Sequence, residues 1–156
     1  MSQNTETTRA ALVATLLSVP QVGVVHAYER YAKDLMRLRA LYVATLPDGD
    51  QLRGWYVRRL AFRVTRNGAG RPFVHTTWLL RGLMALSDEA QSELAFDDLV
   101  DDVRRAIEVD PTLGGAVQTT LFDKELGAQL QAAGPVMFAG VLCHAADLVV
   151  TTETLE

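Results

Sequence analysis

The chain has 156 residues, of which 49% are apolar and 22% charged, and its formal net charge is −4. This length and apolar content suffice to bury a core without disulfides, which excludes an intrinsically disordered chain. One domain over residues 1–156 is expected, with residues 1–7 flexible. The single cysteine, Cys143, excludes an internal disulfide and is typical of a reducing compartment.

No apolar run approaches the length that crosses a membrane. Residues 1–17 also lack the basic start and the small-residue cleavage site of a signal peptide. We therefore expect no membrane partner and a location in the cytosol of the producing cell.

Charge is segregated along the sequence. Residues 30–81 carry eleven Lys or Arg and three Asp or Glu, whereas residues 82–156 carry three Lys or Arg and fourteen Asp or Glu. If this asymmetry persists in space, the basic face of one subunit can meet the acidic face of the next in a head-to-tail contact, which builds rings. The alternative is that the two halves interleave in one sheet and their charges cancel locally.

The first expected element is a helix that begins near Thr7 or Thr8 and ends at Pro20. Its apolar residues recur at helical spacing and predict a core stripe of Leu12, Val13, Leu16, Leu17 and Val19. A strand follows at residues 22–25. Residues 33–43 fit a second helix, with a strand over residues 39–44 as the alternative. The Pro-Asp-Gly-Asp sequence at 47–50 predicts a turn.

Residues 53–66 alternate as in a β-strand. One face is expected to carry Tyr56, Leu60, Phe62 and Val64, and the other Trp55, Val57, Arg59, Ala61 and Arg63. The Asn-Gly-Ala-Gly sequence at 67–70 predicts a hairpin connection, because glycine adopts positive φ at little cost. The next strand, residues 72–86, should therefore pair antiparallel with the first.

Residues 92–109 carry the strongest helical pattern. Apolar residues recur every three or four positions and predict one stripe of an amphipathic helix, made of Phe96, Leu99, Val100, Val103 and Ile107. This stripe is expected to cover the 72–86 strand. Residues 116–122 fit a short strand, residues 123–133 either a helical turn or a loop, and residues 136–152 a central strand that is apolar on both faces. The fold class is therefore α+β, with a mostly antiparallel or mixed sheet of about four to five strands and flanking helices.

Residues that resemble catalytic or metal-binding groups have simpler explanations. Asp97, Asp98, Asp101 and Asp102 can share a divalent cation on a helix, but enzymes of that kind need a second acidic cluster on a facing helix. A solvated or subunit-facing surface is therefore preferred. Cys143 and His144 are neighbours in a strand and point to opposite faces, so the imidazole cannot activate the thiol.

The remaining motifs do not indicate an active site. His26, His75 and His144 fall in separate strands without metal-ligand spacing. The sequence contains no phosphate-binding glycine loop, nucleophile elbow or zinc-binding helix motif. We predict a protein that is not an enzyme and uses no catalytic residues, cofactor or metal.

Arginines are concentrated in the 53–66 strand beside Trp55 and Tyr56. Cationic and aromatic residues together can bind nucleic acid, but the acidic net charge argues against a dedicated DNA-binding protein. A subunit contact or a partly covered sheet face is preferred. The resulting hypothesis is an interface in which Arg58, Arg59, Arg63 and Arg66 lie opposite Asp97, Asp98, Asp101 and Asp102.

Five stretches resemble, in order, a family of small morphogenesis proteins of tailed phages and prophages. They span most of the chain and are VGVVHAYERYAKD (22–34), RGWYVRR (53–59), LRGLMALSDEAQSELAFDDLVDDV (80–103), TLGG (112–115) and PVMFAGVLCHAADLVV (135–150). A glycine–tryptophan strand start, an aspartate turn before a Ser-Glu-x-x-Phe-Asp helix and a carboxy-terminal cysteine–histidine strand recur in that family. In size and expected fold the chain is also similar to tail terminator (tail completion) proteins.

The resemblance implies an α+β core that assembles as a hexameric ring and has no catalytic residues. Such a ring caps the tail tube, ends its polymerisation and offers a surface to the head-side connector in the neck, while DNA passes through its lumen without sequence-specific contact. The implied partners are further copies of the chain, the tail tube protein and the neck connector. The implied location is the virion, after assembly in the bacterial cytoplasm. Another neck component, a stopper or head–tail connector, is the alternative.

Overall fold

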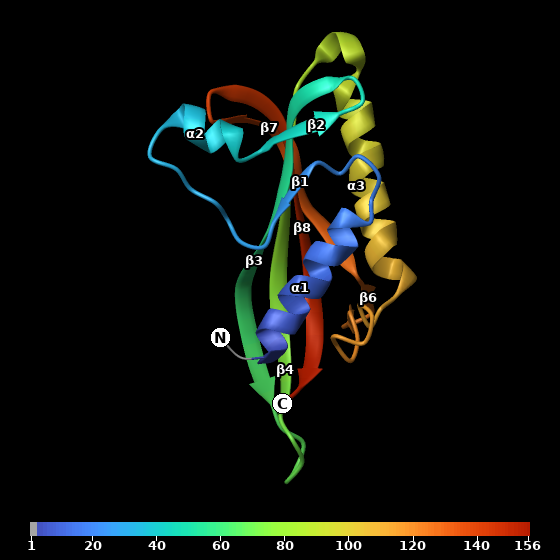
Figure 1. The fold of residues 1–156 in the computed structure, drawn as a ribbon. Helices are drawn as coiled ribbons and strands as arrows, with labels where there is room; N and C mark the ends of the chain where they lie inside the picture. The colour runs from blue at the N-terminus through green and yellow to red at the C-terminus, as the bar shows by residue number, and fades with distance from the viewer. Residues whose placement is uncertain (1–2) are drawn as a thin grey trace.

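A six-stranded sheet forms the centre of the computed structural model, which describes residues 3–156 (Figure 1). The strands follow the order β1-β3-β4-β8-β7, and β2 pairs with the first residues of β3. All pairs are antiparallel except β1 with β3, which is parallel. The strands are β1 (Val24–His26), β2 (Val43–Leu46), β3 (Gly49–Thr65), β4 (Phe73–Ala85), β7 (Ala128–Phe138) and β8 (Val141–Leu155).

Two helices cover one face of this sheet, which we call the helical face. Helix α1 (Gln3–Leu17) lies over the β1–β3 side, and α3 (Ser92–Val109) lies over β4, β8 and β7 (Figure 1). The apolar stripe of α3 packs with Trp55, Trp78 and Leu148 of the sheet in the main core. The expected α+β class is thus confirmed, although the sheet has one strand more than the range predicted. No helix within residues 3–156 is long and apolar enough to span a membrane.

Shorter segments cover parts of the opposite face. A short helix, α2 (Leu35–Ala40), and the residues around it lie over its upper end as drawn in Figure 1, where Tyr42, Tyr56 and Cys143 belong to a second buried cluster. A small hairpin of β5 (Leu121–Phe122) and β6 (Glu125–Leu126) lies over its lower end. There the ring of Phe122 is centred 5.2 Å from that of His75.

Several predictions of elements are confirmed. Helix α3 has the predicted bounds, and its five stripe residues are buried. Strand β4 matches the predicted strand at 72–86 within a residue at each end, and it pairs antiparallel with β3 through the expected hairpin connection. The turn predicted at 47–50 connects β2 to β3.

The prediction for the amino-terminal residues is wrong in part. Residues 3–7 are helical, whereas Met1 and Ser2 lie outside the described residues. Thr8 is buried inside α1 and does not cap it. The helix starts early because its first turn is held against the last strand, where Asn4 Nδ2 donates to Leu155 O at 3.4 Å. Of the predicted stripe, Leu17 is exposed instead of buried.

Residues 33–46 follow neither of the two alternatives fully. Helix α2 ends at Ala40, and β2 begins only at Val43. Asp34 caps α2, because its carboxylate accepts a hydrogen bond from Arg37 N–H at 2.9 Å.

A β-bulge corrects the predicted faces of β3. Arg59 pairs with Trp78 and Ala61 with Thr77, so Leu60 has no cross-strand partner. Because of this extra residue, the side chains of β3 after Leu60 point to the face opposite the one predicted. Phe62 and Val64 therefore share the helical face with Trp55 and Val57, whereas Ala61 and Arg63 lie on the opposite face.

The carboxy-terminal strand predicted at 136–152 is wrong as a single element. The chain forms a hairpin of β7 and β8 with a tight turn at Ala139–Gly140, and residues 128–133, expected as a helical turn or loop, belong to β7. The predicted central position is confirmed for β8, which pairs with β4 on one side and β7 on the other.

Candidate assembly surface

Strand β3 has an open edge along its carboxy-terminal half, the lower half in Figure 1. Its outer side pairs with β2 and β1 only up to Tyr56, and the guanidinium of Arg9 donates to Val57 O at 3.2 Å where β1 ends. Beyond that point the outer backbone groups of β3 pair with no other segment in the described part of the chain. All of residues 58–65 are exposed. We call residues 58–65 the β3 edge.

The other end of the sheet is open as well. Strand β7 pairs only with β8, and residues 130–135 are all exposed. This stretch, LQAAGP, carries no charge, and Pro135 has no N–H to offer a neighbour. We call residues 130–135 the β7 edge. A sheet with two open edges can continue into a neighbouring molecule unless its edges are blocked.

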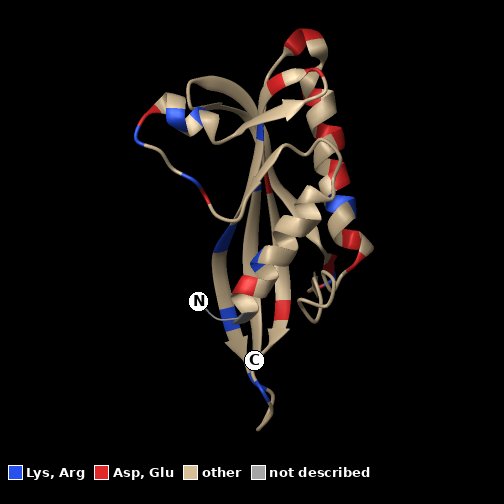
Figure 2. Cartoon of the chain, viewed as in Figure 1, with Lys and Arg blue, Asp and Glu red and all other residues tan. Residues whose placement is uncertain are grey.

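The two margins of the sheet carry opposite charge (Figure 2). Basic residues lie along the outer half of β3, and acidic residues lie along α3 on the other side of the molecule. Helix α3 borders the β7 edge, because a cavity of about 200 Å³ between them is lined by Glu93, Phe96, Asp97, Ala133, Gly134 and Pro135. The segregation of charge along the sequence is therefore also present in space at the two margins of the sheet.

In the middle of the sheet, by contrast, the two halves of the chain interleave. Arg81 of β4 lies 3.6 Å from Asp147 of β8, and His75 Nε2 lies 3.0 Å from a carboxylate oxygen of Glu153. Local cancellation, the alternative interpretation of the sequence, thus holds for these central strands and does not hold for the margins.

The four arginines of the proposed interface are placed differently from one another. Arg58 and Arg63 lie on the opposite face; Arg58 is 3.4 Å from Glu29, and Arg63 stands over the ring of Phe122 at 5.6 Å. Arg59 lies on the helical face over the exposed ring of Phe62, at 5.2 Å. Arg66 lies in the hairpin connection beyond the strand. Among residues 3–156, Arg59, Arg63 and Arg66 have no ion-pair partner.

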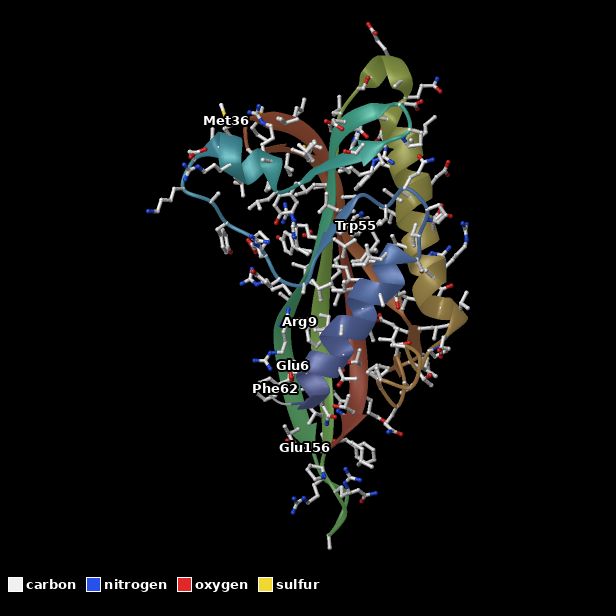
Figure 3. The ribbon with its side chains drawn as sticks, viewed as in Figure 1. Glu6, Arg9, Met36, Trp55, Phe62 and Glu156 are labelled. Carbon is white, nitrogen blue, oxygen red and sulfur yellow. The ribbon has the colours of Figure 1, made fainter. Side chains whose placement is uncertain are left out.

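Arg59 also stands close to a second cation. Burial, followed by the nearby charge of Arg59, lowers the pKa of Arg9 from its ordinary value. Figure 3 shows Phe62 at the outer margin of β3, below Arg9 of α1. This margin of the helical face is therefore positive and partly apolar, and a carboxylate from another molecule would relieve the repulsion between the two guanidinium groups.

The four aspartates of α3 fall into two classes. Asp101 lies 3.6 Å from Arg104, and Asp102 lies 3.4 Å from Arg105, so both have partners within the helix. Asp97 and Asp98 have no ion-pair partner within the described chain. Successive helical residues are turned by about 100°, so Asp97 flanks β7 whereas Asp98 points away from the sheet.

Groups that resemble an active site have structural partners. Ser92 Oγ lies 2.7 Å from His144 Nε2 and accepts a hydrogen bond from Ser87 N–H at 2.8 Å, so the pair joins the start of α3 to β8. Both side chains are buried. The pairing of Ser92 with His144 has no signal in the sequence, because 51 residues separate the two positions.

Cys143 and His144 lie in different environments, as their positions in one strand predict. Cys143 belongs to the buried cluster on the opposite face, and burial raises the pKa of its thiol to about 11. His26 donates from Nε2 to Leu41 O at 2.6 Å, and each histidine thus has a partner of its own. Within residues 3–156, no group of three or more Asp, Glu, His or Cys is placed to hold a metal ion.

An exposed apolar surface with basic neighbours lies around α2. Its apolar members are Tyr28, Tyr31, Leu35 and Met36, and its cations are Arg30, Lys33 and Arg37. Helix α2 lies at the end of the molecule opposite the β3–β4 hairpin (Figure 1). Tyr28 and Arg30 instead flank Glu29, which lies 3.4 Å from Arg58 of the β3 edge.

Sequence patterns did not reveal the β7 edge. Its residues are small or uncharged, and the same composition suits a loop, a turn or a strand. Comparison with known proteins finds no family model that matches this chain and no curated protein with a similar sequence.

Proposed function

We propose that the protein is a structural morphogenesis protein of a phage or prophage tail, in which several copies form a ring at the head-proximal end of the tail tube. In this role it is a tail terminator: the ring caps the tube, stops its growth and offers its other side to the neck. The five sequence stretches that resemble such proteins, together with the α+β fold, support this function.

The observation that carries the proposal is the placement of opposite charge at the two margins of one sheet. Unpaired cations lie along the β3 edge, and unpaired carboxylates lie on α3 beside the β7 edge. A protein with two different, complementary margins joins head to tail, and such a contact closes into a ring when the rotation between copies allows it. Exposed residues of α2, including Leu35, Met36 and Arg37, lie at the end of the molecule opposite the β3–β4 hairpin and are then available to the tube or the neck.

A second candidate, a nucleic-acid-binding accessory protein, has one observation in its favour. Arg58, Arg59 and Arg63 follow one another along the exposed β3 edge, Arg66 lies just beyond it, and Phe62 between them is 55% exposed. Exposed aromatic rings between cations can stack on unpaired bases. This candidate requires retention on single-stranded DNA that falls steeply as salt is raised.

The direct experiment combines the protein with the tail tube protein of the same phage or prophage. Tube protein is polymerised with increasing amounts of this chain, and tube length is measured by negative-stain imaging. A terminator shortens the tubes and appears as a ring at one end of each. Tubes of unchanged length and unchanged ends would contradict the proposal, and salt-sensitive retention on DNA without tube capping would favour the second candidate.

A further inference from the structure

We propose that copies of this chain join by strand pairing, the β3 edge of one copy adding to the β7 edge of the next so that the two sheets become continuous. The occupant of each open edge is thus a second copy of the same protein. The inference deepens the proposed function, because it states how the subunits of the ring meet.

The directions of the strands agree with this contact. Strand β3 runs antiparallel to β4, β4 to β8, and β8 to β7, so β3 and β7 of one copy point in opposite directions. Two copies placed side by side in the same orientation therefore bring β3 of one antiparallel to β7 of the other. The new pair continues the antiparallel pattern already present in each subunit.

Charge selects this pairing over two symmetric ones. Pairing of the β3 edge with the β3 edge of another copy would place the arginines of both strands close together, and like charges in adjacent strands are destabilising. The β7 edge carries no charge that would favour pairing with itself, and Pro135 removes one donor from it. The β3–β7 pairing instead places cations beside the acidic flank of α3.

The side chains on the helical face also match. With the centres of the two edges aligned, Arg59 of one copy falls beside the cavity that Glu93 and Asp97 line in the next. Phe62 falls near Leu130, and both of these apolar side chains are about half exposed in the single chain. The contact thus pairs two unpartnered charges and covers two exposed apolar groups.

The offset between the edges is compatible with a closed ring. Cross-strand neighbours place Tyr56, Arg81, Asp147 and Ala132 at one level, so the β7 edge lies about six residues, roughly 20 Å, above the centre of the β3 edge. Each copy adds four strands, which span roughly 19 Å across the sheet. Joining edges with this offset inclines the strands by roughly 45° to the axis of the ring, which is close to the strand tilt in closed β-barrels.

Disulfide trapping between two different variants tests the contact. Phe62→Cys is mixed under oxidising conditions with Leu130→Cys, or with Ala133→Cys for the neighbouring register, and intact masses distinguish mixed from identical pairs. Native Cys143 stays, because it is fully buried. Met36→Cys is the matched control, because Met36 is 78% exposed on α2 and lies far from Phe62 in Figure 3.

We expect mixed β3–β7 dimers to exceed dimers of identical variants and dimers with Met36→Cys by at least tenfold. Predominance of identical pairs, equal trapping of the control or no dimer with any combination would overturn the inference. Rings that cap tail tubes but give no β3–β7 cross-link would contradict the inference and leave the proposed function standing. A β3–β7 cross-link without tube capping would support the inference and contradict the proposed function.

Charge exchange gives a second, independent readout. Arg59→Glu alone and Asp97→Arg alone should each weaken association at least tenfold, whereas the double variant should recover to within about threefold of the wild type. Asp98→Arg makes the same charge change on the same helix but on the side turned away from the sheet, and it should have no comparable effect. Equal effects of Asp97→Arg and Asp98→Arg, or no recovery in the double variant, would overturn the inference.

Discussion

At the scale of single residues, the closest packing in the core depends on a missing side chain. Gly82 lies directly across from Trp55, whose indole is fully buried against it. A Cβ atom at position 82 would come within 2.5–2.7 Å of three carbons of the indole ring. The large ring thus fills the space that any other residue at position 82 would need.

Gly82→Ala should therefore destabilise the protein. Overpacking of a rigid core costs roughly 1–3 kcal/mol, because the ring cannot move without disturbing its own neighbours. Gly134→Ala is the matched control, since a Cβ there meets no atom within 4 Å. Urea unfolding should show a clear loss of stability for the first variant and little change for the second; equal losses would contradict this packing.

The thiol of Cys143 makes stability depend on pH in the alkaline range. Burial raises its pKa to about 11, whereas the thiol of the unfolded chain titrates near 8.5. The folded state therefore holds its proton more tightly, and the resulting stability is present below about pH 8.5 and is lost as pH rises through 11.

The wild type should lose free energy of unfolding more steeply between pH 8.5 and 11 than Cys143→Ala does. Comparison with this variant is needed because burial also raises the pKa values of Tyr42 and Tyr56, which both proteins retain. Urea unfolding at several pH values measures the difference. Parallel profiles for the two proteins would show that the thiol is not held neutral by the fold.

At the scale of elements, α3 is stabilised by its buried stripe and not by its charged side. Phe96 is 3% exposed and stacks on His144 with ring centroids 5.7 Å apart, whereas Leu94 on the same helix is 60% exposed. Phe96→Ala should cost roughly 3–5 kcal/mol, because it leaves a cavity between helix and sheet. Leu94→Ala should change stability by less than about 0.5 kcal/mol. Similar midpoints of urea unfolding for the two variants would contradict this assignment.

Elements whose pattern matches their own packing were predictable from the sequence. The stripe of α3 repeats at helical spacing, and the Asn-Gly-Ala-Gly connection between β3 and β4 contains residues that suit a turn. In both cases the local preference and the tertiary environment agree. The same holds for the alternation of β3 up to Arg59.

Elements that depend on distant contacts were not predictable. The Ala139–Gly140 turn has a usual turn residue only at its second position, because Ala139 adopts a positive φ of 51°, where Asn, Asp or Gly is favoured. Arg39, one hundred residues earlier, donates two hydrogen bonds to Ala139 O at 2.9 and 3.1 Å, which stabilises the turn. The bulge at Leu60 is equally hidden, because apolar and basic residues continue to alternate after the faces exchange.

The proposed interface was predictable only as a tendency. The segregation of charge along the sequence is typical of a protein whose basic and acidic groups lie apart, and the structure places them at opposite margins of the sheet (Figure 2). The sequence could not show that Asp97 and Asp98 are unpaired whereas Asp101 and Asp102 form ion pairs, because the ion pairs within α3 depend on side-chain geometry. It also could not indicate the β7 edge, whose composition is uninformative.

At the scale of the whole molecule, the chain is an open segment of a sheet. Its helical face is covered by α1 and α3, and its central charges are paired within the subunit. Strand-edge backbone donors and acceptors lie unpaired at its two margins, on β3 and β7, with unpaired charged side chains beside them. An assembly that joins these margins satisfies both kinds of group at once.

Hydrogen exchange of the backbone amides, compared between the single chain and its assembly with or without tail tube protein, tests this account most directly. Assembly should slow exchange in residues 58–65 and 130–134 together, because strand pairing gives their outer amides acceptors that the single chain lacks. Protection around α2 would report the tube or neck contact separately. An assembled species in which residues 58–65 and 130–134 exchange as fast as in the single chain, or a chain that stays monomeric even with tube protein, would contradict the account.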